Sequence, residues 1–368
     1  MNPKLFTPIE LGGVTLPNRI VVSPMCQYSA QAGRMTDWHL MHLGQYACSG
    51  AGMMMVEATG VTPEGRITHG CTGLYDDATE KAMARALGVY RGITQHPIGI
   101  QLAHAGRKAS TQPPFAGGKP LGPNEDPWQT LAPSPIPFGP GWHVPRELTA
   151  LEIKNLIEEF VSATNRANRL GFDAVELHSA HGYLLHQFLS PLANRRNDVY
   201  GREKMLFPLE VARAVREVWP KERCLGARIS ANDWIEGGLG PDDAVSYARE
   251  LDRIGFDYVC VTSGGLVSHA RIPVAPGYQV PFAAKVRKET GISVRSVGMI
   301  VLPEQAEDIV ASGMADMVAL ARGFLDDPRW VWHAAERLGA KLDLPPPYAR
   351  SSPDVWPGAQ IVRPHAAA

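Results

Sequence analysis

The chain lacks the cysteine pattern of a disulfide framework or of a structural zinc site. Its 368 residues include five cysteines, at positions 26, 48, 71, 224 and 260, and no two of them stand in CxxC spacing. Scattered thiols in odd number are typical of proteins that stay in a reducing compartment. The first residues also lack the apolar core of a secretion signal, so we expect a cytoplasmic protein.

An excess of either charge is equally absent. Lys and Arg number 36 against 37 Asp and Glu, for a formal net charge of -1. Without a basic bias or a run of like charges, we expect no nucleic-acid partner. No apolar run reaches the roughly 18 residues of a membrane-spanning helix, so we expect no membrane partner either.

A repeated unit of helix, glycine and short apolar strand runs through the chain. It is clearest at residues 49–57, 170–177, 254–261 and 312–320. These strands do not alternate between apolar and polar residues, which predicts burial on both faces, as in a parallel sheet covered by helices. Four further strands are predicted at residues 20–23, 98–102, 225–229 and 294–297.

Eight strands alternating with helices predict an α/β fold, namely a closed (β/α)8 TIM barrel. The alternative is an open doubly wound sheet, which needs a glycine-rich phosphate turn after its first strand. Here residues 24–28 read Pro-Met-Cys-Gln-Tyr, without that turn. The capping-box pattern Thr149-Ala-Leu-Glu152 predicts one helix start, and Pro303 predicts another.

Residues 112–145 interrupt this rhythm after the third strand. They contain ten prolines and five glycines and are too long for an ordinary connection. We therefore expect an excursion over the barrel mouth, either a lid or a small hairpin. The expected organisation is one barrel domain over residues 1–345 and a C-terminal tail over residues 346–368. The tail is expected to lie at a subunit interface, and its last few residues to be disordered.

The end of the fourth predicted strand is the most informative part of the sequence. It reads His178-Ser-Ala-His181, with Tyr183 two residues further on. Parallel α/β proteins place their chemistry at the carboxyl ends of strands. Two imidazoles can bind one oxygen or one metal ion, and a phenol can transfer a proton. A structural role, an oxygen-binding site and a zinc site all remain open at this point.

Other polar or small residues stand at the ends of the remaining predicted strands. They are Ser23, Cys26, Tyr28, Ala58, Gln101, Arg228, Gly298 and Arg322. Arg322 lies where barrels commonly bind phosphate, and Gly298 permits close approach of the backbone. Gln101 offers a donor and an acceptor to a heterocycle, and Arg228 offers a permanent positive charge. A ligand with a flat polar ring and an anionic end, such as FMN, matches this set.

Nine stretches, spread over almost the whole chain, also carry a resemblance. Among them are Ser23-Pro-Met-Cys-Gln-Tyr28, Gln101-Leu-Ala-His-Ala-Gly-Arg-Lys108, residues 176–196 and Ala321-Arg-Gly323. In these motifs the chain resembles the old yellow enzyme family of FMN-dependent ene-reductases. It looks closest to the bacterial branch of xenobiotic reductases and NADPH dehydrogenases. The resemblance implies hydride transfer from NADPH or NADH, through FMN, to the β-carbon of an activated alkene, with protonation of the α-carbon.

The resemblance implies roles for individual residues. Ser23, Pro24, Met25 and Cys26 would lie along the flavin, Ala58, Gln101 and Arg228 would hold its polar edge, and Ala321 and Arg322 would hold its phosphate. His178 and His181 would hydrogen-bond the activating oxygen of the substrate. Tyr183 would donate the proton, and Tyr28 would line the substrate pocket. Arg350 would reach the site of an adjoining subunit, which implies a homodimer or homotetramer. No metal ion is implied.

Two departures from the family pattern stand out. The loop after Tyr200-Gly201 is shorter than usual, and Ala321 replaces a usual glycine, which requires a negative φ at that position. Two other functions stay open: a zinc-dependent barrel hydrolase that uses the HxxH pair, and a flavin-binding protein without reductase activity.

Overall fold

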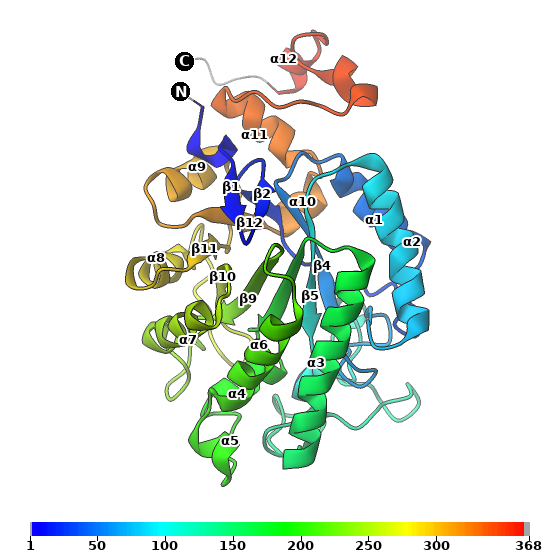
Figure 1. Cartoon of the computed structure of the whole chain (residues 1–368), viewed down its shortest axis with the longest axis vertical. Helices are drawn as coiled ribbons and strands as arrows, with labels where there is room; N and C mark the ends of the chain where they lie inside the picture. The colour runs from blue at the N-terminus through cyan, green and yellow to red at the C-terminus, as the bar shows by residue number, and fades with distance from the viewer. Residues whose placement is uncertain (1, 364–368) are drawn as a thin grey trace.

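The computed structural model, which describes residues 2–363, contains a closed barrel of eight parallel strands (Figure 1). Along the chain these are β3 (Ile20–Val22), β4 (Met53–Gly60), β5 (Ile98–Ala103), β8 (Ala174–Ser179), β9 (Cys224–Ser230), β10 (Tyr258–Thr262), β11 (Ser293–Ser296) and β12 (Met317–Leu320). The last strand pairs with the first, Val318 opposite Ile20, which closes the sheet. The predicted TIM barrel is therefore confirmed, and an open doubly wound sheet is excluded.

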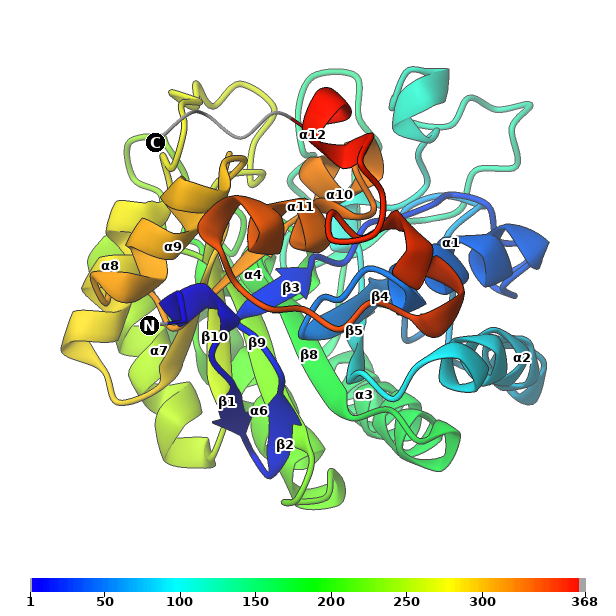
Figure 2. The same cartoon turned by 90° about the horizontal axis from the view of Figure 1, so that it is seen from above.

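Helices form the outer layer of the barrel, as the view in Figure 2 shows. They are α1 (Asp37–Ala47), α2 (Asp77–Ile93), α3 (Ala150–Leu170), α4 (Leu184–Leu189), α5 (Val199–Arg202), α6 (Leu206–Val218), α7 (Pro241–Ile254), α8 (Val280–Glu289), α9 (Pro303–Ala311), α10 (Arg322–Asp326), α11 (Trp330–Leu338) and α12 (Ala359–Val362). The predicted capping box is present, because Thr149 and Glu152 bond to each other's backbone N–H. Pro303 opens α9, as predicted.

A hairpin that the sequence did not indicate closes the amino-terminal end of the barrel. It consists of β1 (Ile9–Leu11) and β2 (Val14–Leu16), paired antiparallel. Its buried Leu11 and Leu16 join a cluster of inward-facing side chains from the strands, including Met53 and Met317. With this end filled by apolar side chains, a ligand can enter only at the carboxyl ends of the strands.

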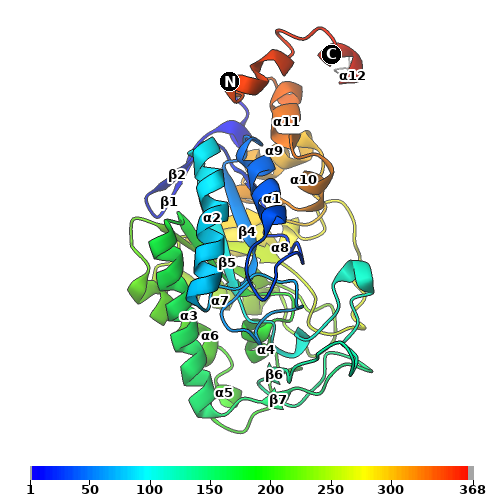
Figure 3. The same ribbon diagram turned by 90° about the vertical axis from the view of Figure 1, so that its right-hand side faces the viewer.

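Residues 112–145 lie on the opposite side of the barrel from that hairpin (Figures 2 and 3). The segment contains the short strand β6 (Leu131–Ala132), which pairs in parallel with β7 (Arg146–Glu147). The segment is therefore an excursion from the barrel. Because β6 and β7 are parallel, they do not form the small hairpin that was one of the two expected arrangements. Arg107, which follows β5, anchors it by donating to the backbone oxygens of Ile136 and Pro137 at 3.1 and 3.4 Å.

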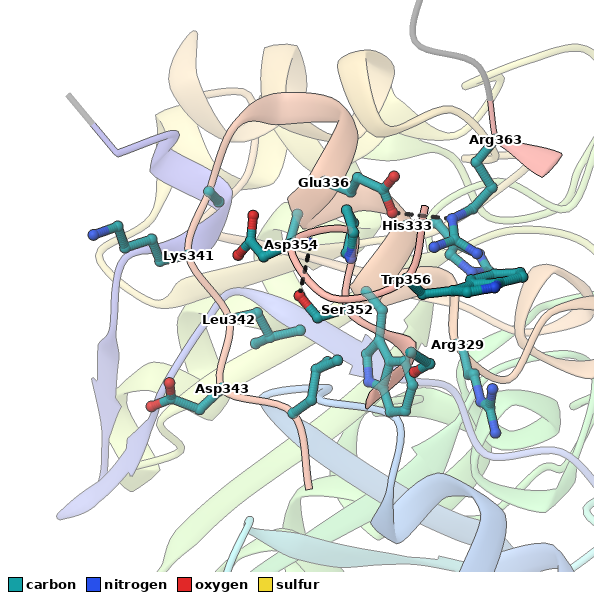
Figure 4. Close-up of a pocket in the computed structure, with 16 residues that line it drawn as sticks. Arg329, His333, Glu336, Lys341, Leu342, Asp343, Ser352, Asp354, Trp356 and Arg363 are labelled. Carbon is teal, nitrogen blue, oxygen red and sulfur yellow. Dashed lines mark hydrogen bonds and ion pairs between the residues drawn. The ribbon is translucent and has the colours of Figure 1, made fainter. Parts of the chain in front are cut away.

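The C-terminal tail lies at the other end of the molecule from this excursion (Figures 1 and 3). After α11 it forms the 3-10 helix η4 (Pro346–Ser351) and then α12. A cavity of about 560 Å³ separates α11 from the tail, and Figure 4 shows Arg363 bonded to Glu336 across it, at 3.0 Å. None of the predicted site residues lines this cavity. Residues 364–368, the predicted disordered end, lie outside the described residues.

Within residues 2–363, no helix combines the length and the apolar character that crossing a membrane requires.

Candidate active site

His178, His181 and Tyr183 converge at the carboxyl end of β8. The ring centroids of the two histidines are 5.2 Å apart, and those of His178 and Tyr183 are 4.8 Å apart. His178 belongs to the strand, whereas His181 lies in the following turn with φ at 58°. A left-handed conformation is unusual for a residue other than glycine and occurs often at functional sites. The structure thus brings the three predicted catalytic residues together.

Three contacts from other parts of the barrel fix His181 in this conformation. Its backbone N–H donates to Ser230 Oγ at 3.0 Å, and its Nε2 lies 3.0 Å from Thr262 Oγ1. Its carbonyl oxygen accepts from Lys108 Nζ at 2.8 Å. Hydroxyl and amine groups from three parts of the barrel therefore meet at His181, because β9, β10 and the loop after β5 each supply one contact.

Lys108 also lies beside Tyr183, a position that was not predicted from the sequence. Its ammonium donates to Gly265 O at 2.9 Å and lies 5.1 Å from the centre of the Tyr183 ring. Desolvation and the charge of Arg107 lower the pKa of Lys108 to about 7. The only sequence signal was its place at the end of the motif that begins at Gln101. That motif carried the resemblance but gave no role to this side chain.

The electrostatic environment keeps the three catalytic candidates uncharged. Desolvation, and then the positive charge of Arg228, lower the pKa of both His178 and His181 well below the usual value. Desolvation likewise raises the pKa of Tyr183 well above its usual value. At neutral pH the site therefore presents two neutral imidazoles, each carrying one N–H, and a protonated phenol.

A cavity of about 490 Å³ opens directly beside His181. Its lining includes the predicted cofactor-binding residues Ser23, Arg228, Gly298, Ala321 and Arg322. Ala321 has φ at −111°, which meets the requirement of a negative φ at that position. Gly298 has φ at 108°, and a Cβ there would lie 2.5 Å from Gln279 Nε2. Only glycine fits this turn.

Gln101 and Ala58 lie next to each other on the barrel wall. A register shift in β4 between Val56 and Ala58 leaves Glu57 unpaired and sets Ala58 opposite Gln101. Gln101 donates to Glu176 Oε1 at 2.7 Å. In the described part of the chain, Arg228 Nε and His178 Nδ1 are buried without a hydrogen-bond partner. Buried polar atoms of this kind are expected to meet a polar ligand or water.

The segment after β3, with Ser23, Pro24, Met25 and Cys26, is fixed by a network that the sequence did not reveal. Glu57 accepts from the backbone N–H of Gln27 at 3.0 Å and lies 3.3 Å from His39 Nε2. A hydrogen bond with Cys71, together with burial, raises the pKa of Cys26 well above its usual value, so it is a neutral thiol. Tyr28 packs edge-on against Phe115 of the excursion, with centroids 6.2 Å apart.

Two further points concern Arg350, whose reach into an adjoining subunit stays a prediction, and the zinc alternative. Arg350 is exposed on η4 and does not line the cavity of its own chain. For zinc, no cluster of three or more His, Cys, Asp or Glu side chains suited to a metal ion occurs among residues 2–363. The HxxH pair thus lacks the third protein ligand of a catalytic zinc site.

Comparison with known proteins agrees with this geometry. Residues 4–341 match the model of the NADH:flavin oxidoreductase / NADH oxidase family. The chain is 43% identical to an NADPH dehydrogenase of Geobacillus thermodenitrificans, over 95% of this chain and 99% of that protein. It is 41% identical to an NADPH dehydrogenase of Listeria innocua over the same shares. A solved structure of morphinone reductase in complex with tetrahydroNAD superposes with a TM-score of 0.75 at 29% identity, covering 94% of this chain and 93% of that one.

These matches span nearly the whole chain and leave the barrel without a large unmatched part. The family model, the relatives and the cavity beside His181 all indicate the same cofactor chemistry. The chain therefore belongs to the NADH:flavin oxidoreductase / NADH oxidase family, in its old yellow enzyme group, and is an FMN-dependent NAD(P)H oxidoreductase.

Proposed function

We propose that this oxidoreductase is an ene-reductase that reduces alkenes activated by a carbonyl or nitro group, such as enones, enals, maleimides and nitroalkenes. The observation that carries the proposal is the meeting of two neutral imidazoles and one protonated phenol beside the cavity. The imidazoles can hold an oxygen on which negative charge develops. The phenol supplies a proton at neutral pH.

The lining of the cavity supports a placement for FMN. Arg322, with Ala321 and Gly298, lines the cavity and would hold the phosphate. Ser23, Pro24, Met25 and Cys26 would lie along the ring, while Ala58, Gln101 and Arg228 would meet its polar edge. The unpartnered Arg228 Nε supports this placement, because a buried guanidinium nitrogen needs an acceptor.

When bound, FMN would supply the chemistry of hydride transfer between reduced nicotinamide and the β-carbon of the alkene. His178 and His181 would donate hydrogen bonds to the activating oxygen, which draws electron density from the double bond. Tyr183 would then protonate the α-carbon. Tyr28 and the neighbouring Phe115 would line the approach to the double bond. Lys108 would hold His181 in position beside Tyr183 through its hydrogen bond to the His181 carbonyl oxygen.

The fold of the relatives supports the entry of nicotinamide at the same mouth. Morphinone reductase, which shares the fold over 94% of this chain, was solved with tetrahydroNAD bound. The filled amino-terminal end of the present barrel leaves the carboxyl-terminal mouth for that purpose. Both half-reactions would then use one site in turn, with nicotinamide leaving before the alkene binds.

The test is to replace Tyr183 by Phe and to measure the two half-reactions separately by stopped flow. Reoxidation of the reduced enzyme by cyclohexenone should slow by about 100-fold or more, the usual range for loss of a general acid. Reduction of the enzyme by NADPH should stay close to the parent rate, because that step needs no proton from the phenol. Equal losses in both half-reactions would contradict the assigned role.

A matched control is Tyr247→Phe. Tyr247 is also a buried tyrosine, but its hydroxyl lies 3.1 Å from Ser179 Oγ on the outer side of β8, away from the cavity beside His181. Both half-reactions should be unaffected in this variant. If NADPH bleaches the parent protein and no alkene of the four classes restores its colour, the chain is a flavin-binding reductase of another acceptor, and the ene-reductase proposal fails.

A further inference from the structure

A chain of hydrogen bonds crosses the inside of the barrel below the mouth. Gln101 Nε2 donates to Glu176 Oε1 at 2.7 Å, and Tyr258 OH donates to Glu176 Oε2 at 2.9 Å. Arg295 forms an ion pair with the same Oε2, and its guanidinium lies 4.5 Å from the centre of the Tyr258 ring. These four side chains are at most 1% exposed, so solvent does not compete for their bonds.

The direction of every bond in this chain follows from Arg295. A guanidinium can only donate, and a carboxylate can only accept. Glu176 therefore turns one oxygen to Arg295 and the other to Gln101. Because that second oxygen is also an acceptor, Gln101 must present its NH2 group to it. With the NH2 group turned to Glu176, the carbonyl oxygen Oε1 of Gln101 is left for the mouth of the barrel.

We propose that Glu176 is a positioning residue for the cofactor: backed by Arg295, it fixes the amide of Gln101 with the carbonyl oxygen toward the flavin. The inference rests on the proposed placement of the polar edge of the flavin at Gln101. That edge carries one ring N–H between two carbonyl oxygens. A fixed amide with one acceptor and one remaining N–H complements it, whereas an inverted amide would set an NH2 group against the ring N–H.

The variant Glu176→Gln inverts this arrangement without changing its shape. Arg295 can only donate, so the new Gln side chain must keep its oxygen on the Arg295 side. Its NH2 group then faces Gln101, which has to turn its own oxygen inward and its NH2 group to the mouth. An unmatched buried donor costs about 1–3 kcal/mol, so the affinity for FMN should fall by about 5- to 150-fold.

The experiment titrates apoprotein with FMN and follows the quenching of flavin fluorescence. Besides Glu176→Gln, it uses the exchange variant Gln101→Glu/Glu176→Gln. In the exchange, the Gln at 176 donates its NH2 group to one oxygen of the Glu at 101, and the other oxygen again offers an acceptor to the mouth. We expect the exchange variant to recover most of the affinity lost in Glu176→Gln. Gln101→Glu alone, with two facing carboxylates, should bind worst.

Tyr258→Phe is the matched control, because it removes a buried hydrogen bond from the same carboxylate but from the oxygen that faces away from Gln101. It should lower stability and leave the affinity for FMN within a few-fold of the parent. A loss in Tyr258→Phe equal to that in Glu176→Gln would mean that general disturbance of the core explains the effect, and would overturn the inference.

The outcomes also separate this inference from the placement on which it rests. If Gln101→Met binds FMN as tightly as the parent, the polar edge of the flavin is not at Gln101 and the placement itself fails. If Gln101→Met weakens binding and a folded Glu176→Gln does not, only the positioning role fails. Should Glu176→Gln not fold, the exchange variant still decides: affinity no better than that of Gln101→Met contradicts the proposal.

Discussion

At the scale of single residues, Lys108 shows how a side chain to which its motif assigned no role can connect the parts of a site. It joins the loop that carries His181 to the loop that carries Gly265, through hydrogen bonds of 2.8 and 2.9 Å. A neutral amine can make both bonds as well as an ammonium can, since each needs only one N–H. Its charge is therefore not required for the connection, and it is costly in a desolvated position.

This cost makes the stability of the protein depend on pH. The pKa of Lys108 is lowered from 10.5 to about 7 in the folded state. Below pH 7 the lysine is protonated in both states, and the folded state bears the full cost. As pH rises from 7 to 10.5, the unfolded chain still binds a proton that the folded protein has released, so the free energy of unfolding rises.

We predict that the Lys108→Met variant lacks this rise in the free energy of unfolding above pH 7. The difference in unfolding free energy, parent minus variant, should increase between pH 7 and pH 9.5 when it is measured by urea denaturation. The exposed Lys154 on α3 provides the control, since Lys154→Met should give a difference that does not change over the same range. A parent and a Lys108→Met variant with parallel pH profiles would show that the lysine does not titrate there.

At the scale of elements, α3 begins where its cap dictates. Thr149 accepts from the Glu152 N–H at 3.2 Å, and Glu152 accepts from the Thr149 N–H at 2.8 Å. Loss of such a cap typically costs about 1 kcal/mol. Thr149→Ala should therefore reduce the free energy of unfolding by about that amount, with no change in the rate of enone reduction, because the cap is remote from the cavity beside His181. Thr149→Ser, which keeps the hydroxyl, should stay near the parent in both measurements.

The bulge in β4 illustrates the opposite case, in which an element is shaped by its neighbours. The run of residues 53–60 predicts a strand, but nothing in it marks Glu57 as the residue that drops out of register. The bulge forms where Glu57 meets His39 and the backbone of Gln27. Those partners belong to other segments, so local sequence alone could not locate it.

At the scale of the whole molecule, the position of the tail bears on subunit assembly. Arg350 is exposed and does not line the cavity beside His181 of its own chain, and the tail that carries it lies at the other end of the molecule from the excursion of residues 112–145 (Figures 1 and 3). The proposed role of Arg350 in substrate binding thus requires a second copy of the chain. Arg350→Ala should raise KM for the enone more than it lowers the rate of enzyme reduction by NADPH.

Mixing two defective variants tests directly whether Arg350 of one subunit acts in the active site of another. Arg350→Ala and Tyr183→Phe each damage every site in a homo-oligomer. In a dimer of one chain of each kind, one site combines the intact Tyr183 with the intact Arg350 of the other chain. If exchange is complete, about a quarter of all sites in an equimolar mixture should regain enone reduction. No recovery in a mixture shown to contain hetero-oligomers would mean that Arg350 does not act across subunits.

The sequence by itself determined the barrel, since glycine-closed helices and doubly buried strands repeat along the chain and this pattern depends on local physics. It also determined that His178, His181, Tyr183 and the cavity-lining residues such as Arg228 stand at strand ends, because parallel strands bring their carboxyl ends to one face.

The protonation states and hydrogen-bond directions of these groups, in contrast, follow from the folded structure. The hairpin that fills the opposite end, the desolvation that keeps both imidazoles neutral, and the link from Gln101 through Glu176 to Arg295 all depend on contacts between segments distant in the sequence. Hydrogen-bond direction and pKa are properties of the surroundings of a group, and the surroundings exist only once the chain has closed on itself.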